Sequence, residues 1–171
     1  TVYEILRKHP KRRLYIDIKN VDLDQLARET SAAHVTAQLI LASTDYAVIR
    51  RWKELAPASA TLHWMGGSEE QLSKRLAALR EVRFASIDQL QIHVHAKEGR
   101  IEPSPEFLME TGRELRGHGI LFQVFPWQSK DPTLFRLLMS FGVASFATDY
   151  PDVAMRTVRD YYAERGTQPK P

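Results

Sequence analysis

Residues 14–20 read Leu-Tyr-Ile-Asp-Ile-Lys-Asn, a stretch in which aliphatic residues alternate with aromatic or polar ones. Because side chains of a β-strand point alternately to its two faces, Asp17 and Lys19 share one face and the aliphatic residues share the other. The pattern predicts a strand that presents a carboxylate and an ammonium side by side at its C-terminal end. In α/β proteins with parallel strands, ligands bind and chemistry occurs at that end. An ion pair that only faces solvent would give the same pattern.

The composition is that of an ordinary globular chain of 171 residues, 43% hydrophobic and 26% charged, which is enough for one substantial core. The net charge is +3, and the densest basic run, between Arg7 and Arg13, has no interleaved aromatic residues, so we expect no nucleic-acid partner. The lack of cysteine excludes disulfides, thiolate zinc sites and cysteine nucleophiles. The sequence contains no run of about 18 apolar residues, so it predicts no transmembrane segment.

The first residues already follow a helical pattern and include no initiator methionine. We therefore expect further residues before Thr1, and any targeting signal with them. The sequence chooses neither a compartment nor an oligomeric state.

Six apolar runs, each followed by a helical pattern, make up the chain. This strict alternation predicts a parallel sheet with right-handed crossovers. We expect one domain over residues 1–166, with Trp52 and Trp64 in its core, and a disordered tail over residues 167–171. The predicted strands are 14–19, 38–43, 60–65, 87–94, 120–127 and 143–148, with a longer loop at 97–103 after the fourth.

The fourth predicted strand distinguishes an open sheet from a barrel. Its polar residues Gln89, Gln91, His93 and His95 alternate with apolar ones. A central strand of an open doubly wound sheet should be apolar on both faces, whereas a barrel interior near its mouth can be polar. We therefore predict an α/β fold, a TIM-type (β/α) barrel represented by about the last six of its eight βα units. An exposed edge strand would explain the same pattern.

Other residues with chemical potential stand near the predicted strand ends. Trp127 can wall a binding site, although most tryptophans in strands only pack. His93 and His95 lack the third ligand that a zinc site needs, which favours a hydrogen-bonded polar layer. Asp149 is expected to cap the last helix rather than to line a pocket. Ser43 has no base beside it that would make it a nucleophile.

Four segments follow one another along the chain: IDIK at 16–19, LILASTDYAVIRRWKELAP at 39–57, GILFQVFPWQSK at 119–130 and GVASFATDYPD at 142–152. In this order they resemble the glycerophosphodiester phosphodiesterase family. That family typically shows a Glu-Ile-Lys strand, a Ser-Phe strand end, a Trp-Thr-Val-Asn strand end and a terminal Thr-Asp-Tyr-Pro. The resemblance extends over essentially the whole chain, and TDYPD at 148–152 is its most specific part.

The resemblance implies a TIM-type barrel that hydrolyses glycerophosphodiesters, small-molecule substrates, to glycerol phosphate and an alcohol. It also implies one divalent cation, Ca²⁺ or Mg²⁺, with Asp17 as a metal ligand and Lys19 as the catalytic cation near the phosphate. Trp127 corresponds to the family's tryptophan at the substrate pocket. We expect His93 and Gln91 to line the same site.

Two departures from the family pattern bear on activity. Asp17 stands where glutamate is usual, and its shorter side chain would shift the metal by about one bond length or require a bridging water. The His-Arg-Gly, Glu-x-Asp and His-Asp motifs that precede this region in the family are absent, although such hydrolysis needs several oxygen ligands and an acid–base pair. We therefore expect this chain to be the C-terminal part of a larger enzyme and to be inactive alone. The alternative is a catalytically inactive barrel that binds a phosphorylated or polyol ligand.

Overall fold

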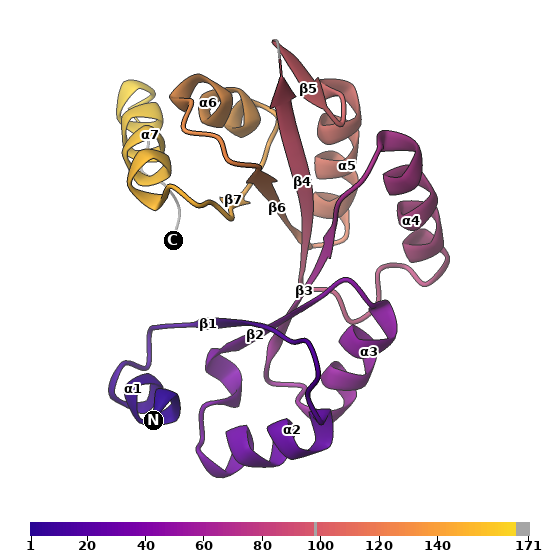
Figure 1. Cartoon of the computed structure of the whole chain (residues 1–171), viewed down its shortest axis with the longest axis vertical. Helices are drawn as coiled ribbons and strands as arrows, with labels where there is room; N and C mark the ends of the chain where they lie inside the picture. Colours follow the sequence, from indigo (N-terminus) through magenta and orange to yellow (C-terminus); the bar gives the residue numbers. More distant parts are fainter. Residues whose placement is uncertain (98, 167–171) are drawn as a thin grey trace. The chain divides into compact units, whose positions relative to one another are not determined.

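The structure, a computed structural model, describes residues 1–97 and 99–166, so the predicted tail at 167–171 lies outside the described residues. Helices and strands alternate along the chain (Figure 1), as the sequence predicts. The helices are α1 (Val2–Lys8), α2 (Leu23–Ala32), the 3₁₀ turn η1 (Thr36–Gln38), α3 (Tyr46–Leu55), α4 (Glu69–Glu81), α5 (Pro105–Gly117), α6 (Pro132–Ser140) and α7 (Pro151–Glu164). The strands are β1 (Leu14–Asp17), β2 (Leu39–Ser43), β3 (Ala60–Met65), β4 (Gln89–Lys97), β5 (Arg100–Glu102), β6 (Leu121–Pro126) and β7 (Ser145–Phe146).

The chain divides into two compact units. The first unit comprises Thr1–Met65 and Ala77–Leu90, and the second comprises Gly66–Leu76 and the chain from Gln91 onward. Helix α4 and strand β4 each contribute residues to both units. The single domain over residues 1–166 stays a prediction.

The first unit contains a parallel sheet of β1, β2 and β3, with Leu14 beside Leu39 and Ile40 beside Ala60. This register places Tyr15 and Asp17 on the same face as Ile40, Ala42 and Leu62, which form a buried apolar cluster. Trp64 is half-buried and packs against that cluster rather than lying fully inside the core.

The fully buried tryptophan of the first unit is Trp52, on helix α3. This helix contacts β2 and β3, and its residues Ile49 and Trp52 repeat at the three-residue spacing that places side chains on one helical face. The predicted core position of Trp52 is confirmed.

Asp88 ties β3 to the segment that leads into β4. Its carboxylate Oδ2 accepts hydrogen bonds from the backbone N–H of Thr61 at 2.8 Å, from Thr61 Oγ1 at 3.1 Å and from Lys53 Nζ at 2.8 Å. The charge is thus satisfied by three donors, one of them a cation, which is how a carboxylate is retained close to a core.

In the second unit, β6 and β7 are parallel, with Gln123 beside Ser145. Strand β4 is bonded to β6 through the N–H of Trp127 and the carbonyl of Val94 at 2.9 Å, and it also pairs with β5, antiparallel to it. In the strand order of the sheet β4 stands between β3 and β6, so it is not the exposed edge strand that its polar pattern also allowed.

Two sequence-based predictions in the second unit are wrong. The predicted loop at 97–103 contains β5, which folds back on β4 after a turn in which Gly99 adopts a φ of +76°. Glycine reaches this left-handed conformation at no steric cost, and that makes the tight reversal possible. The predicted strand at 143–148 is reduced to the two residues of β7.

The predicted capping role of Asp149 is also wrong. The N-cap of α7 is Tyr150, without a side-chain capping bond, and its N–H donates to Thr148 Oγ1 at 3.0 Å. Pro151 occupies the first helical turn, where its missing N–H leaves no unsatisfied donor. Asp149 is exposed.

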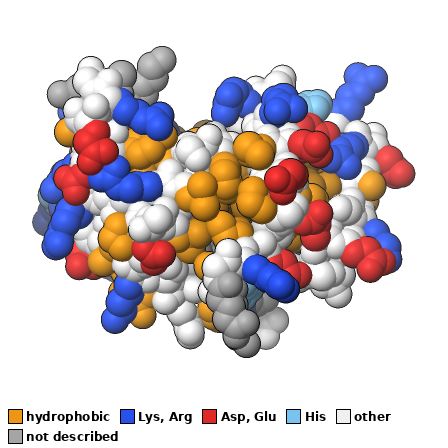
Figure 2. All heavy atoms as spheres, turned by 90° about the horizontal axis from the view of Figure 1, so that it is seen from above, with side chains coloured by type: hydrophobic (Ala, Val, Ile, Leu, Met, Phe, Trp, Pro, Cys, Tyr) orange, Lys and Arg blue, Asp and Glu red, His pale blue; other side chains and the backbone are white. Residues whose placement is uncertain are grey.

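The surface carries mixed charge. Figure 2 shows acidic and basic side chains interspersed, with hydrophobic side chains exposed between them. Across residues 1–97 and 99–166, no helix has both the length and the apolar character that crossing a bilayer requires.

Candidate functional site

Asp17 and Lys19 lie side by side, as predicted, but the predicted strand at 14–19 ends at Asp17, so Lys19 reaches Asp17 from the bend after β1 and not by strand alternation. Lys19 Nζ donates to Asp17 Oδ2 at 2.7 Å, and the two side chains are 74% and 52% exposed, respectively. An exposed ion pair of this kind contributes at most about 1 kcal/mol, so both groups can exchange partners at low cost. The pair is therefore accessible to a ligand.

Tyr15 lies on the same face of β1 as Asp17 and links β1 to the start of β4. Its hydroxyl donates to Gln89 Oε1 at 2.8 Å, which joins residues 74 positions apart in the sequence. Gln89 is buried at the start of β4. The local sequence pattern does not predict this hydrogen bond. It identifies Tyr15 only as an aromatic residue of a strand, and the partner Gln89 is distant in sequence.

Four rings gather in the second unit on one face of β4 and the end of β6. We call His93, His95, Phe125 and Trp127 the ring cluster. His93 lies 5.2 Å from Phe125 and 5.7 Å from Trp127, and Trp127 lies 5.8 Å from His95 and 5.3 Å from Phe125, all between ring centroids. Trp127 is 45% exposed and so is reachable from solvent.

Two buried amides lie deeper on the same strand faces. Gln91 precedes His93 by two residues on β4, and Gln123 precedes Phe125 by two residues on β6. Gln123 Nε2 donates to Ser145 Oγ at 3.1 Å, which continues the polar layer to β7. The hydrogen-bonded polar layer expected for His93 and His95 stays a prediction, and Gln91, at 8% exposure, is buried on the same face of β4.

Gly66, directly after β3, makes room for the His93 imidazole. A methyl group at position 66 would lie 3.1 Å from His93 Nδ1, closer than a comfortable van der Waals contact. The absent side chain thus lets this turn approach the ring cluster closely.

Burial lowers the pKa of His93, and its electrostatic interaction with the neighbouring His95 lowers it further. Below the ordinary histidine value near 6.5, the unfolded chain therefore binds a proton that the folded chain does not. The free energy of unfolding is expected to fall as the pH drops below about 6.5. Denaturant titrations between pH 7.5 and pH 5 test this, with a shallower pH dependence expected for His93→Gln. The exposed His9→Gln is the control, and an unchanged slope in His93→Gln would contradict the assignment.

The described residues do not supply a complete set of metal ligands. Over residues 1–97 and 99–166, no group of three or more histidine, aspartate or glutamate side chains could hold an ion. Asp17 is a hard oxygen donor of the kind that Ca²⁺ and Mg²⁺ prefer, but it is one ligand where several are needed. The fit to a divalent cation is therefore partial.

Ser43 has a structural role. Its Oγ accepts a hydrogen bond from the N–H of Asp45 at 3.0 Å, just before α3. Asp45 in turn caps that helix by accepting from the N–H of Ala47 at 2.8 Å. These bonds form the turn that follows β2.

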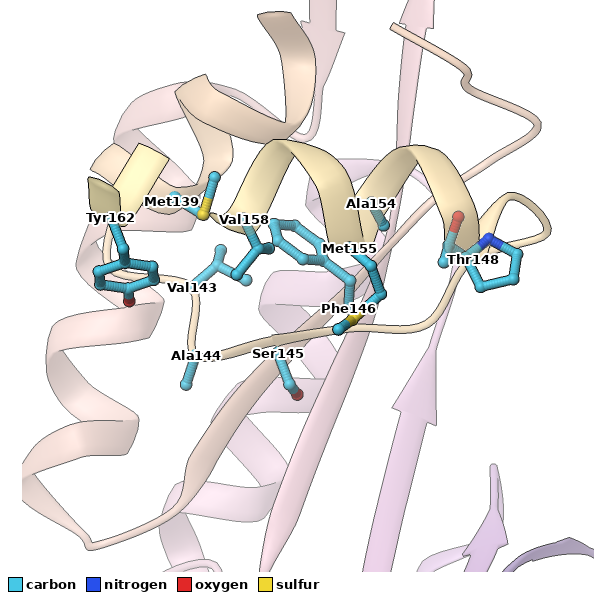
Figure 3. Close-up of a pocket in the computed structure, with 11 residues that line it drawn as sticks. Met139, Val143, Ala144, Ser145, Phe146, Thr148, Ala154, Met155, Val158 and Tyr162 are labelled. Carbon is cyan, nitrogen blue, oxygen red and sulfur yellow. The ribbon is translucent and has the colours of Figure 1, made fainter. Parts of the chain in front are cut away.

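A pocket of about 330 Å³ in the second unit lies beside β7 and α7 (Figure 3). Its walls are mostly apolar, with Phe146, Met155 and Val158 directed into it. The described lining offers the hydroxyls of Ser145, Thr148 and Tyr162 but no cationic side chain, so this pocket suits a charged diester poorly.

The structure thus places Asp17 beside Lys19. It also places His93 beside Trp127, with Gln91 on the same face of β4 as His93. The first pair belongs to the first unit and the other three residues belong to the second. The convergence of the two groups on one cavity, and the role of each residue, stay predictions. Sequence reasoning assigned no site role to Tyr15 or Gly66. It placed Phe125 on the strand face of Trp127 but gave it no role either.

Solved structures with a similar fold include two phosphodiesterases. One is a glycerophosphodiester phosphodiesterase from Parabacteroides distasonis, with 17% identity, a TM-score of 0.61, and 95% of this chain and 63% of that chain covered. Another is a glycerophosphodiester phosphodiesterase from Agrobacterium tumefaciens, with 16% identity, a TM-score of 0.62, and 91% and 59% covered. The chain therefore has the α/β fold of these proteins and spans about three fifths of their length. No protein-family model matches the chain, and no curated protein matches it.

Proposed function

We propose that this chain is the C-terminal part of a metal-dependent hydrolase that converts glycerophosphodiesters to glycerol phosphate and an alcohol. It would form about the last six of the eight βα units of a TIM-type barrel. The observation that carries the proposal is the accessible Asp17–Lys19 pair at the C-terminal end of a parallel strand, in a fold shared with phosphodiesterases. That end of a parallel strand is where such folds place their chemistry.

Lys19 would stabilise the negative charge that grows on the phosphate oxygens as water attacks phosphorus. In the reaction a bond forms between the water oxygen and phosphorus, the bond from phosphorus to the alcohol oxygen breaks, and the alcohol leaves with a proton. A cation beside such a centre stabilises the transition state more than the ground state, because the charge on the phosphate oxygens grows there. The exposed bond of Lys19 to Asp17 leaves its other N–H groups available for phosphate.

Asp17 would be one oxygen ligand of the Ca²⁺ or Mg²⁺ ion. The remaining ligands and the acid–base pair would come from a part of the longer polypeptide outside this sequence. Trp127 and His93 would line the substrate site, with Gln91 supporting them from the buried polar layer.

The proposal is tested on the longest polypeptide that contains this sequence. Purified protein is incubated with a panel of glycerophosphodiesters, and release of glycerol phosphate is followed by phosphorus NMR with Ca²⁺ or Mg²⁺ and with a chelator. We expect hydrolysis that the chelator abolishes and that the 171-residue chain alone does not show. Hydrolysis that persists in the chelator would overturn the metal dependence, and the absence of any hydrolysis would overturn the enzyme.

A non-catalytic binding protein is the second candidate. It is favoured by the absence of a complete ligand set among the described residues. Calorimetry with glycerol phosphate distinguishes the two functions, because binding without turnover of any diester by the longer polypeptide would favour the binding protein.

A further inference from the structure

We infer that a basic loop of the first unit binds the surface of an anionic lipid bilayer. The basic loop consists of Lys8, Lys11, Arg12 and Arg13, which lead from the end of α1 to the start of β1 (Figure 1). The inference goes beyond the proposed function and does not depend on it.

The charge of the basic loop is dense and uncompensated. All four residues are exposed, and the sequence has no acidic residue between Glu4 and Asp17. Within residues 1–97 and 99–166, none of the four forms an ion pair or a hydrogen bond through its side chain. The carboxylate of Asp17 is itself bound by Lys19. Cations that lie within a Debye length of about 10 Å of one another add their fields, so the loop attracts a multivalent anionic partner more than a single anion.

Gln38 fixes the backbone that carries these cations. Its side-chain amide Nε2, which has two N–H donors, is hydrogen-bonded to the carbonyl oxygens of Leu6, His9 and Arg12, each at 3.0 Å. The N–H of Arg12 also donates to the carbonyl of His9 at 2.9 Å, which closes a turn with Pro10 at its second position. Because one side-chain atom contacts three carbonyls, this segment is a compact loop rather than an extended one. The cations are therefore held close together before a partner arrives, which lowers the entropy that binding costs.

Two exposed apolar side chains lie next to the basic loop. Val2 and Ile5 of α1 are each 54% exposed, and Lys8 continues their three-residue spacing. This spacing places the three side chains in one row along the helix. Leu6 is buried instead and anchors α1 to the first unit. An apolar row that ends in cations is typical of a helix at a membrane interface, where the apolar side chains enter the headgroup region and the cations stay beside the lipid phosphates.

A nucleic acid carries the same phosphate charge, but the basic loop does not suit it. Proteins that bind single strands stack the bases on aromatic side chains, and the sequence has no aromatic residue between Arg7 and Arg13. Val2 and Ile5 would gain little from a phosphate backbone, whereas a bilayer would remove them from water. The observations therefore favour a lipid surface.

The basic loop and the Asp17–Lys19 pair lie at opposite ends of β1. Arg13 directly precedes the strand, and Asp17 is its last residue. A bilayer bound at the loop would thus leave Asp17 and Lys19 accessible. Membrane binding is therefore separable from hydrolysis, and either can fail without the other.

The experiment measures how the longest polypeptide that contains this sequence sediments with lipid vesicles. Vesicles of phosphatidylcholine alone are compared with vesicles of an equal mixture of phosphatidylcholine and phosphatidylglycerol. We expect binding to the anionic vesicles, at least about tenfold weaker binding to the neutral ones, and loss of binding as salt is raised.

Two variants test the residues that carry the inference. Replacing all four basic-loop residues by glutamine should weaken binding to anionic vesicles at least about 100-fold, since each cation near such a surface contributes about fivefold. The double variant Val2→Ser with Ile5→Ser keeps every charge and should weaken binding by about 5- to 20-fold.

The matched control removes the same charge elsewhere. Arg50, Arg113, Arg156 and Arg159 are exposed residues of α3, α5 and α7, and their joint replacement by glutamine should leave vesicle binding within about twofold, because surface attraction acts only over about a Debye length. Circular dichroism shows whether each variant is folded.

Four results would overturn the inference: no binding of anionic vesicles, equal binding of neutral and anionic vesicles, equal losses in the two quadruple variants, or normal binding by a folded Val2→Ser with Ile5→Ser variant. Binding of a single-stranded RNA without binding of anionic vesicles would also overturn it and would assign the basic loop to a nucleic acid.

Discussion

Replacing Asp17 by alanine is expected to lower hydrolysis of a glycerophosphodiester by the longer polypeptide at least about 100-fold. Loss of a residue that only supports a metal ligand already costs about 10- to 100-fold, and Asp17 is proposed as a ligand itself. Asp17→Glu should retain activity, because glutamate is the residue usual at this position in the family that the sequence resembles. Metal-dependent turnover of each variant, measured over a range of Ca²⁺ and Mg²⁺ concentrations, gives the result.

The control for Asp17→Ala is Asp24→Ala. Asp24 forms an ion pair with Arg51 at 2.9 Å, on a surface exposed to a similar degree as the Asp17–Lys19 pair. Both substitutions remove one exposed, paired carboxylate from the first unit, so only a role in chemistry separates them. Equal activity of the two alanine variants would remove Asp17 from the metal site.

Trp52→Ala is expected to destabilise the folded chain by about 3–5 kcal/mol, the usual cost of removing a fully buried large aromatic side chain. Trp52 is completely inaccessible on the face of α3 that meets β2 and β3. Its Nε1 has no hydrogen-bond acceptor among the described residues. Trp52→Phe should therefore cost much less, because it leaves a smaller cavity and removes an unsatisfied donor. Urea denaturation of each variant measures the losses.

Trp127→Ala provides the comparison for Trp52→Ala at the same residue type. Because Trp127 is 45% exposed, we expect it to cost about 1 kcal/mol. Losses of the same size at both positions would show that Trp52 does not anchor the core of the first unit.

The arrangement of the ring cluster shows where prediction from sequence ends. The alternation of β4 correctly indicates that Gln91, His93 and His95 share a face, since that follows from strand geometry alone. The contacts of Trp127 with His93 and His95 depend on how β6 packs beside β4, more than 30 residues away in sequence. Glu102 lies opposite His95 because the segment predicted as a loop forms β5, which pairs with β4.

The sequence by itself determined the alternation of helices and strands, most of their bounds, and the Asp17–Lys19 pair. These features depend on neighbours within a few positions, whose geometry the backbone imposes locally. Only the tertiary structure decided three features: the hydrogen bond from Tyr15 to Gln89, the donors around Asp88, and the rings that contact Trp127. Those contacts arise when distant segments bury their apolar faces together, and that packing sets which polar groups meet.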